Sequence, residues 1–230
     1  MKLLKLISTL LDYPDDELWE HGEELLAAAA EVDLPAPRGT ALQEFIRTLL
    51  EQDPLTSQDA WLSTFDRGRS MSLLLFEHIH GESRDRGQAM ANLLEAYQRA
   101  GLELTARELP DYLPLLLEFL STRAPSEVRF WLVYINHIVG MLAARAAERH
   151  SPYALLFEIL VELAESQVDM ETLRHRASEE PRDDTPEAMD RLWEEEVVRF
   201  GSTPPDANGA PPCRPAFAAS ARAQGQPRVP

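Results

Sequence analysis

The stretch VRFWLVYINHIVGML, residues 128–142, is apolar around most of the circumference of the helix that it would form. A surface helix normally has a polar face, so this composition indicates a helix surrounded by other helices. We expect a long central helix between Ser126 and Arg149, with His137 in the core. Asn136 and His137 interrupt its most apolar part, which is shorter than the ~20 residues of a membrane span. No membrane insertion is expected.

Apolar residues recur at helical spacing along most of the chain, and no strand-like alternation of useful length is visible. Thr56 and Asp59 resemble a capping box at a helix start. Ser151 followed by Pro152 predicts another start, with a helix running to about Gln167. The sequence therefore predicts an all-α, single-domain bundle of roughly nine to ten helices.

The composition changes toward the C-terminus. Residues 158–200 contain 14 acidic and 5 basic residues, and the segment after residue 200 is rich in proline, alanine and small polar residues. Such segments bury too little apolar surface to offset the entropy of ordering. We expect a helical domain over 1–168, an acidic segment over 169–200 with a short helix near 185–199, and a disordered tail over 201–230.

The 39 acidic and 22 basic residues give the chain of 230 residues a net charge of -17. This charge repels nucleic acid and anionic membranes and favours a cationic peptide as partner, although an acidic surface also serves solubility alone. Cys213 is the only cysteine, which excludes an internal disulfide and a thiolate metal cluster. The apolar start of the chain soon meets acidic residues, which indicates a folded helix rather than a secretory signal. A cytoplasmic protein is expected.

The motif FEHIHGESRDRGQAM, residues 76–90, concentrates histidines and carboxylates. On one helix, His78 and His80 would lie about 200° apart around the axis and would not share a metal ion. A helical metal-dependent hydrolase is nevertheless an open alternative, and it would use His78, His80, Glu82 and Asp85.

A corner between two helices explains this motif better. Gly81 would end the first helix and Ser83 would cap the second, with Asp85 in its first turn. Glu82 and Arg86 would then pair across the corner. Exposed corners on a rigid helical scaffold often carry recognition groups.

A second motif, ELPDYLPLLLEFLS, covers residues 108–121. Asp111 is predicted to be the N-cap of the helix that follows, because Pro114 then falls in the first turn, where proline is tolerated. Glu108 and Tyr112 are left to face a groove.

Enzyme signatures are absent from the sequence: it contains no metalloprotease His-Glu-x-x-His pattern, no phosphate-binding glycine loop and no serine hydrolase motif. The stretch DDTPE, residues 183–187, has the spacing of a magnesium-binding motif, but Pro186 and the surrounding charges indicate a helix start instead. The residues favour a binding protein over an enzyme.

Three stretches carry a family resemblance: LLLFEHIHGESRDRGQAM (73–90), LPDYLPLLLEFL (109–120) and EEPRDDTPEAMDRLWEEEVVRFG (179–201). They resemble the assembly chaperones of respiratory nitrate reductase, the NarJ family, within the redox-enzyme maturation chaperones that include TorD and DmsD. Tyr112 stands where the wider family has histidine, so a role assigned to that histidine does not apply here.

The resemblance implies an all-helical cytoplasmic chaperone that binds the N-terminal segment of the apo catalytic subunit of nitrate reductase. It would hold that subunit open while the molybdenum cofactor (bis-molybdopterin guanine dinucleotide) and an iron–sulfur cluster are inserted. We expect no permanently bound cofactor, transient contact with the molybdenum cofactor, and contact with molybdenum cofactor biosynthesis proteins.

The client is expected to be basic and partly apolar, with Phe76 and Tyr112 as apolar anchors and with Glu82, Glu108 and Asp111 selecting charge. An acidic regulatory scaffold that works through its C-terminal segment is the remaining alternative. The expected partner-binding residues are Phe76, Glu77, His78, His80, Glu82, Arg84, Asp85, Arg86, Glu108, Pro110, Asp111, Tyr112 and Leu113.

Overall fold

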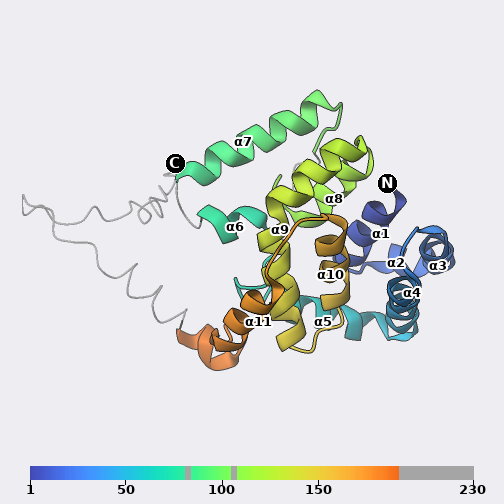
Figure 1. Ribbon diagram of the computed structural model, residues 1–230. Coiled ribbons are helices and arrows are strands. Elements are labelled where there is room, and N and C mark those ends of the chain that lie inside the picture. The colour runs from blue at the N-terminus through green and yellow to red at the C-terminus, as the bar shows by residue number, and fades with distance from the viewer. Residues whose placement is uncertain (81–83, 105–107, 192–230) are drawn as a thin grey trace, which may run out of the picture. The chain divides into compact units, whose positions relative to one another are not determined.

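The computed structural model describes residues 1–80, 84–104 and 108–191, and the side chains of His80 and Arg84 lie outside this description. The described residues form helices joined by short connections, without a β-strand, so the all-α prediction is confirmed (Figure 1). Eleven helices lie wholly within the described part: α1 (Lys2–Leu11), α2 (Asp16–Glu20), α3 (Gly22–Glu31), α4 (Ala36–Glu51), α5 (Pro54–Phe65), α6 (Leu75–His80), α7 (Arg84–Arg99), α8 (Leu113–Ser121), α9 (Pro125–Glu148), α10 (Ala154–Leu163) and α11 (Met170–Glu179).

Helix α9 is the centre of the bundle, as its composition predicts. It contacts α6, α8, α10 and α11, and one face buries Leu132, Ile135 and Leu142. It begins at Pro125 with Ala124 as N-cap, slightly before the predicted start. Among the described helices it alone is long and apolar enough to cross a membrane, but most of it is buried, which is typical of the core helix of a soluble protein.

The prediction that His137 lies in the core is wrong. His137 is exposed and Asn136 is buried beside it. The reason is that no described helix covers one face of the first half of α9. Phe130, at 67% exposure, and Tyr134 lie seven and three residues before His137 on that face.

Two predicted helix starts are shifted. Helix α10 begins at Ala154 rather than at Ser151, because His150 has a positive φ of 54° and Ser151 belongs to the turn that ends α9. The helix also stops at Leu163, before a second left-handed residue at Glu165. Helix α5 begins at Pro54, where Asp53 rather than Thr56 is the cap and accepts a hydrogen bond from the Thr56 amide at 3.2 Å.

The acidic segment contacts the helical domain. Helix α11 lies along the second half of α9, where Gly140 leaves room for it: a β-carbon at residue 140 would come within 2.8 Å of the Leu173 side chain. Residues 186–191 are helical, in agreement with the start of the predicted helix near 185–199. The rest of that helix and the predicted disorder of 201–230 lie outside the described residues, and the predicted boundary at residue 168 stays a prediction.

Candidate functional site

The two motifs meet in space although about 35 residues separate them. Leu74 and Tyr112 form an isolated antiparallel bridge. On its two sides the Leu75 amide donates to the Asp111 carbonyl at 3.0 Å, and the Leu113 amide donates to the Leu73 carbonyl at 2.8 Å. These backbone bonds hold the start of α6 against the start of α8. The result is one joint, which we call the motif junction (residues 73–78 and 108–113).

Asp111 is the buried centre of the motif junction. Its side chain has no exposed surface, and its Oδ2 accepts a hydrogen bond from the Phe76 amide in the first turn of α6 at 3.0 Å. Asp111 therefore caps α6, and the prediction that it is the N-cap of α8 is wrong, because Tyr112 has that position. The bridge at Tyr112 directs the Asp111 carboxylate toward the other motif.

The Asp111 carboxylate is only partly satisfied. Its Oδ1 is buried and has no hydrogen-bond partner among the described residues. Burial raises the pKa of this carboxyl, while the Phe76 amide and the charge of Arg86 act in the opposite direction. A buried acceptor without a partner is costly, so the junction contains a weak point.

Arg86, in the first turns of α7, connects that helix to α6. Its Nη2 lies 3.4 Å from the Glu77 carboxylate, and its Nε is buried without a hydrogen-bond partner in the described residues. The predicted partner, Glu82, lies outside the described residues. The helix-to-helix corner is thus held in part by an ion pair between Glu77 and Arg86.

His78 is engaged with the backbone. Its Nε2 lies 2.8 Å from the Ser72 carbonyl, and burial lowers the pKa of the imidazole. In the neutral form this nitrogen donates to the carbonyl and is not a metal ligand. The structure contains no group of three metal-ligating side chains within the residues it describes, although His80 and Glu82 of the proposed metal set cannot be placed.

Two tyrosines connect the second motif to other helices. Tyr112 donates its hydroxyl to Asp12, at the end of α1, at 2.9 Å, and Tyr97 of α7 donates to the Pro110 carbonyl at 2.8 Å. Burial raises the pKa of both hydroxyls. Tyr112 is therefore a structural link as well as a half-exposed side chain.

The expected binding residues divide into buried and accessible groups. Phe76, at 7% exposure, and Leu113 pack in the core, so Phe76 is not a surface anchor in this conformation. Asp85 and Glu108 are exposed. The half-buried members are Glu77, His78, Arg86, Pro110 and Tyr112.

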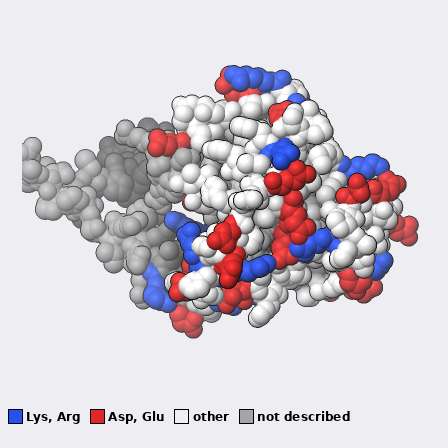
Figure 2. All heavy atoms as spheres, viewed as in Figure 1, with Lys and Arg blue, Asp and Glu red and all other residues white. Residues whose placement is uncertain are grey.

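Glu108 and Pro110 line a groove of about 640 Å³ between the end of α7 and the segment that leads to α8. Leu94 and Leu104 give it apolar walls, and Glu103 adds a second carboxylate. Figure 2 shows a largely uncharged surface in this view, with acidic and basic side chains side by side mainly in its lower and right-hand parts. We call this depression the acidic groove; its lining residues are Leu94, Gln98, Gly101, Leu102, Glu103, Leu104, Glu108 and Pro110.

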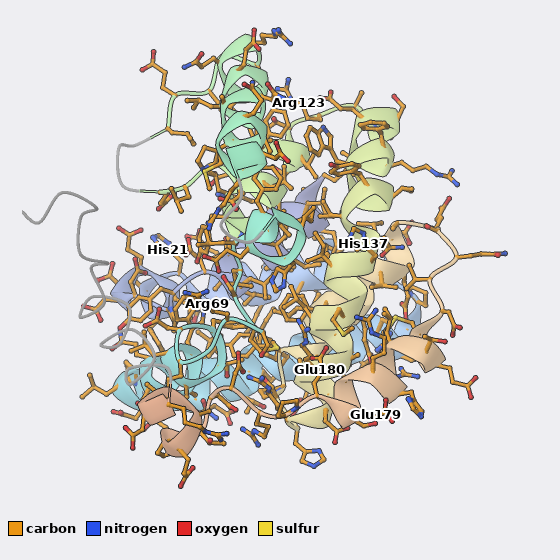
Figure 3. All side chains as sticks on the ribbon, turned by 90° about the vertical axis from the view of Figure 1, so that its left-hand side faces the viewer. His21, Arg69, Arg123, His137, Glu179 and Glu180 are labelled. Carbon is orange, nitrogen blue, oxygen red and sulfur yellow. The ribbon has the colours of Figure 1, made fainter. Side chains whose placement is uncertain are left out.

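The loop that leads into the first motif is held by the acidic C-terminal segment. Asp183 accepts from the Ser70 amide at 2.7 Å, from the Ser70 hydroxyl at 2.6 Å and from Arg149 at 2.8 Å. Arg145 donates to the Ser70 carbonyl at 2.8 Å and binds both oxygens of Glu180. Figure 3 shows Glu180 beside the lower part of α9. We call this network the clasp (Ser70, Arg145, Arg149, Glu180 and Asp183).

Sequence reasoning missed the clasp because DDTPE was interpreted only as a helix start. Burial alone would raise the pKa of Asp183, but the hydrogen bonds from Ser70 and Arg149 outweigh it and lower that pKa. Gly68 belongs to the same arrangement, since a β-carbon there would lie 2.6 Å from the Asp183 carboxylate.

The family model described as nitrate reductase delta subunit matches residues 31–157, which include the whole motif junction. The chain belongs to the nitrate reductase delta subunit family. The family resemblance seen in the motifs is thereby confirmed.

Relatives within this family are similar over most of their length. The nitrate reductase molybdenum cofactor assembly chaperone NarJ of Escherichia coli (strain K12) is 49% identical over 198 residues, which cover 86% of this chain and 84% of that one. The probable chaperone NarW of the same strain is 44% identical over 200 residues, 87% of this chain and 84% of that one. The probable NarJ of Bacillus subtilis (strain 168) is 31% identical over 160 residues, 70% of this chain and 86% of that one.

Proposed function

We propose that this chain is a cytoplasmic assembly chaperone of a respiratory nitrate reductase, and not a catalyst. Its relatives carry the name of molybdenum cofactor assembly chaperones for that enzyme. The observation that carries the proposal for this chain is the motif junction, because it brings the two family motifs together beside the acidic groove.

The proposed client is the N-terminal segment of the apo catalytic subunit, bound in the acidic groove. A basic and partly apolar segment is complementary to Glu103 and Glu108 and to the apolar walls at Leu94 and Leu104. The net charge of -17 would speed encounter with such a segment. In this arrangement Asp111 and Phe76 support the groove from within and do not touch the client.

The molybdenum cofactor is cargo for the client in this proposal. The chaperone keeps the client open while the cofactor is inserted, and contact with the cofactor or with the proteins that deliver it is transient. Nothing in the mechanism requires the chain to retain a metal or an organic group of its own.

The test is a calorimetric titration of the full chain with a synthetic peptide of the client's N-terminal segment. The variant Glu103→Lys/Glu108→Lys should weaken binding roughly tenfold or more at low salt, because two attractive carboxylates become repulsive ammonium groups. The double variant Glu20→Lys/Glu51→Lys is the matched control, since it changes the net charge equally at exposed sites on α2 and α4.

Equal weakening by both variants would show that only the general field of the molecule attracts the peptide. Absence of binding to the unaltered chain, together with failure to co-purify with the apo catalytic subunit, would refute the chaperone function itself.

A further inference from the structure

A cavity of about 500 Å³ opens between α4, α5 and the start of α10, on helices that carry neither motif. Its walls are largely apolar. The single charged residue in the lining is Glu44, whose carboxylate pairs with Arg47 at 3.0 Å. The lining residues are Ala41, Glu44, Phe45, Thr48, Leu49, Gln52, Ser57, Ala60, Pro152, Tyr153 and Leu155.

Tyr153 and Ser57 are the two buried side chains of this lining that carry a hydroxyl group. The Tyr153 side chain is only 4% exposed, and its ring packs edge to face against Phe45 and Phe65 with centroid distances of 5.6 and 4.9 Å. The Tyr153 hydroxyl makes no hydrogen bond to any residue that the structure describes, yet it is not sealed from solvent. Because Tyr153 lines the cavity, we infer that its hydroxyl is reached from there.

The unpaired hydroxyl distinguishes Tyr153 from the other buried tyrosines. Tyr97 and Tyr112 both donate to oxygen atoms of the protein, as buried tyrosines usually do. Burial raises the pKa of Tyr153 to about 12, so its hydroxyl keeps its proton and offers a donor. The nearby Ser57 hydroxyl is already used, because it donates to Gln52 at 3.1 Å.

We propose that this cavity binds an uncharged, mainly apolar small molecule whose carbonyl or ether oxygen accepts a hydrogen bond from Tyr153. The cavity volume lies in the range of small-molecule sites, roughly 300–1,000 Å³, and such sites combine apolar walls with a few placed polar groups. Glu44 and the net charge of -17 oppose an anionic ligand. This inference does not depend on the proposed chaperone function.

The test compares two probes, benzophenone and diphenylmethane, which have similar shape but differ in the carbonyl oxygen. Titrations of the full chain, followed by amide chemical shifts, should show benzophenone perturbing residues 41–60 and 152–155. Tyr153→Phe should weaken benzophenone binding roughly fivefold, the effect of one neutral hydrogen bond. The same substitution should leave the binding of diphenylmethane unchanged.

Two further variants locate the site. Ala60→Trp places a large side chain at an exposed position on the rim and should abolish binding of both probes. Phe130→Ser removes the most exposed aromatic side chain of α9 and should change nothing. Irradiation of bound benzophenone should attach it to peptides from α4, α5 or α10.

Three results would overturn the proposal: no saturable binding of either probe, equal weakening of both probes by Tyr153→Phe, or photolabelling concentrated on α9. Perturbation of the same amides by a client peptide in the absence of probe binding would also overturn it, since the occupant would then be a polypeptide.

Discussion

Asp183 and Asp111 bind the two ends of one short stretch, residues 70–76. The pKa values of their carboxyl groups are shifted in opposite directions. Asp183 accepts two hydrogen bonds from Ser70 and one from Arg149, and these lower the pKa of its carboxyl. The side chain of Asp111 accepts one hydrogen bond from the Phe76 amide, and its other oxygen is buried without a partner among the described residues. Burial raises the pKa of this carboxyl. In terms of side-chain hydrogen bonds, the stretch that leads into the first motif is thus held more completely at its start than at its end, where backbone hydrogen bonds also join it to the second motif.

This difference predicts which of the two contacts opens more easily. Opening the clasp breaks hydrogen bonds to both oxygens of Asp183 and both oxygens of Glu180, although the buried Nη1 of Arg149 has no hydrogen-bond partner among the described residues. Opening the motif junction releases a carboxylate whose ionised form is poorly stabilised. Local opening is cheapest where few interactions are lost. We therefore expect α6 and its corner with α7, rather than the clasp, to adapt first when a partner binds beside them.

The largest expected effect comes from breaking the clasp. Asp183→Ala leaves Arg149, a side chain that is only 10% exposed, with Asp184 at 3.6 Å as its remaining carboxylate. The free energy of unfolding should fall by about 3 kcal/mol, less than for a fully buried pair because Asp183 is partly exposed. Denaturant titration measures this loss.

The control for the clasp is Asp190→Ala, which removes an exposed aspartate from the same acidic segment and should cost less than about 0.5 kcal/mol. If both variants lost stability equally, the clasp would be no more than part of a diffuse acidic surface.

The next effect concerns the glycine that admits Asp183. Gly68→Ala places a methyl group 2.6 Å from the Asp183 carboxylate and should cost about 2 kcal/mol. Gly87→Ala, in α7, meets no atom within 4 Å and should stabilise the chain by about 0.5 to 1 kcal/mol. Thermal and denaturant unfolding of both variants provide the measurement.

A double variant sharpens this prediction. If the clash involves the carboxylate, Gly68→Ala should add little to the loss already caused by Asp183→Ala. If the stability losses of Gly68→Ala and Asp183→Ala were fully additive, the methyl group at residue 68 would clash with atoms other than the Asp183 carboxylate.

At the motif junction the effects are smaller and depend on charge. Asp111→Asn keeps an oxygen for the Phe76 amide and removes the buried charge, so stability at neutral pH should stay within about 1 kcal/mol of the parent. Asp111→Ala removes the cap of α6 and should cost about 1 to 2 kcal/mol. Hydrogen exchange at the Phe76 amide reports the same difference locally.

The pH dependence separates the two aspartates. A raised carboxyl pKa in the fold means that stability from Asp111 decreases as pH rises from its ordinary value near 4 to the folded value. A lowered pKa means that stability from Asp183 is present above about pH 4 and is lost as pH falls through the folded value. Acid should therefore release α11 before α6, and exchange data with the reverse order would contradict the comparison.

The sequence predicted the helices well, but it did not predict the hydrogen bonds between residues that are far apart in the chain. Periodicity identified the central helix, because a helix that is apolar all round has no stable place on a surface. Asn136 rather than His137 is buried because of which face of α9 the neighbouring helices cover. The sequence of α9 alone does not determine which face that is. Asp111 was recognised as a cap, but the helix that it caps begins 36 residues earlier in the chain.

The candidate site shows the same limit. The two motifs were identified from their residue types, and their contact rests on backbone bonds between Leu73–Leu75 and Asp111–Leu113 that no local pattern announces. Asp183 binds Ser70, which lies 113 residues away in the chain. From the sequence alone, the acidic residues around Asp183 therefore indicated only the start of a helix. Only the fold shows that a side chain at residue 68 would clash with the Asp183 carboxylate.

His78 should have the least effect on stability; its imidazole interacts with the charges of Arg145, Glu77 and Asp111. Burial lowers its pKa, so its contribution to stability is present above about pH 6.5 and is lost as pH falls toward the folded value. His78→Gln removes this titration and should flatten the stability profile below about pH 6.5 by less than about 1 kcal/mol. His21→Gln, at an exposed position, supplies the baseline for losing one histidine. Identical profiles for the two variants would mean that burial beside the Ser72 carbonyl does not hold His78 neutral.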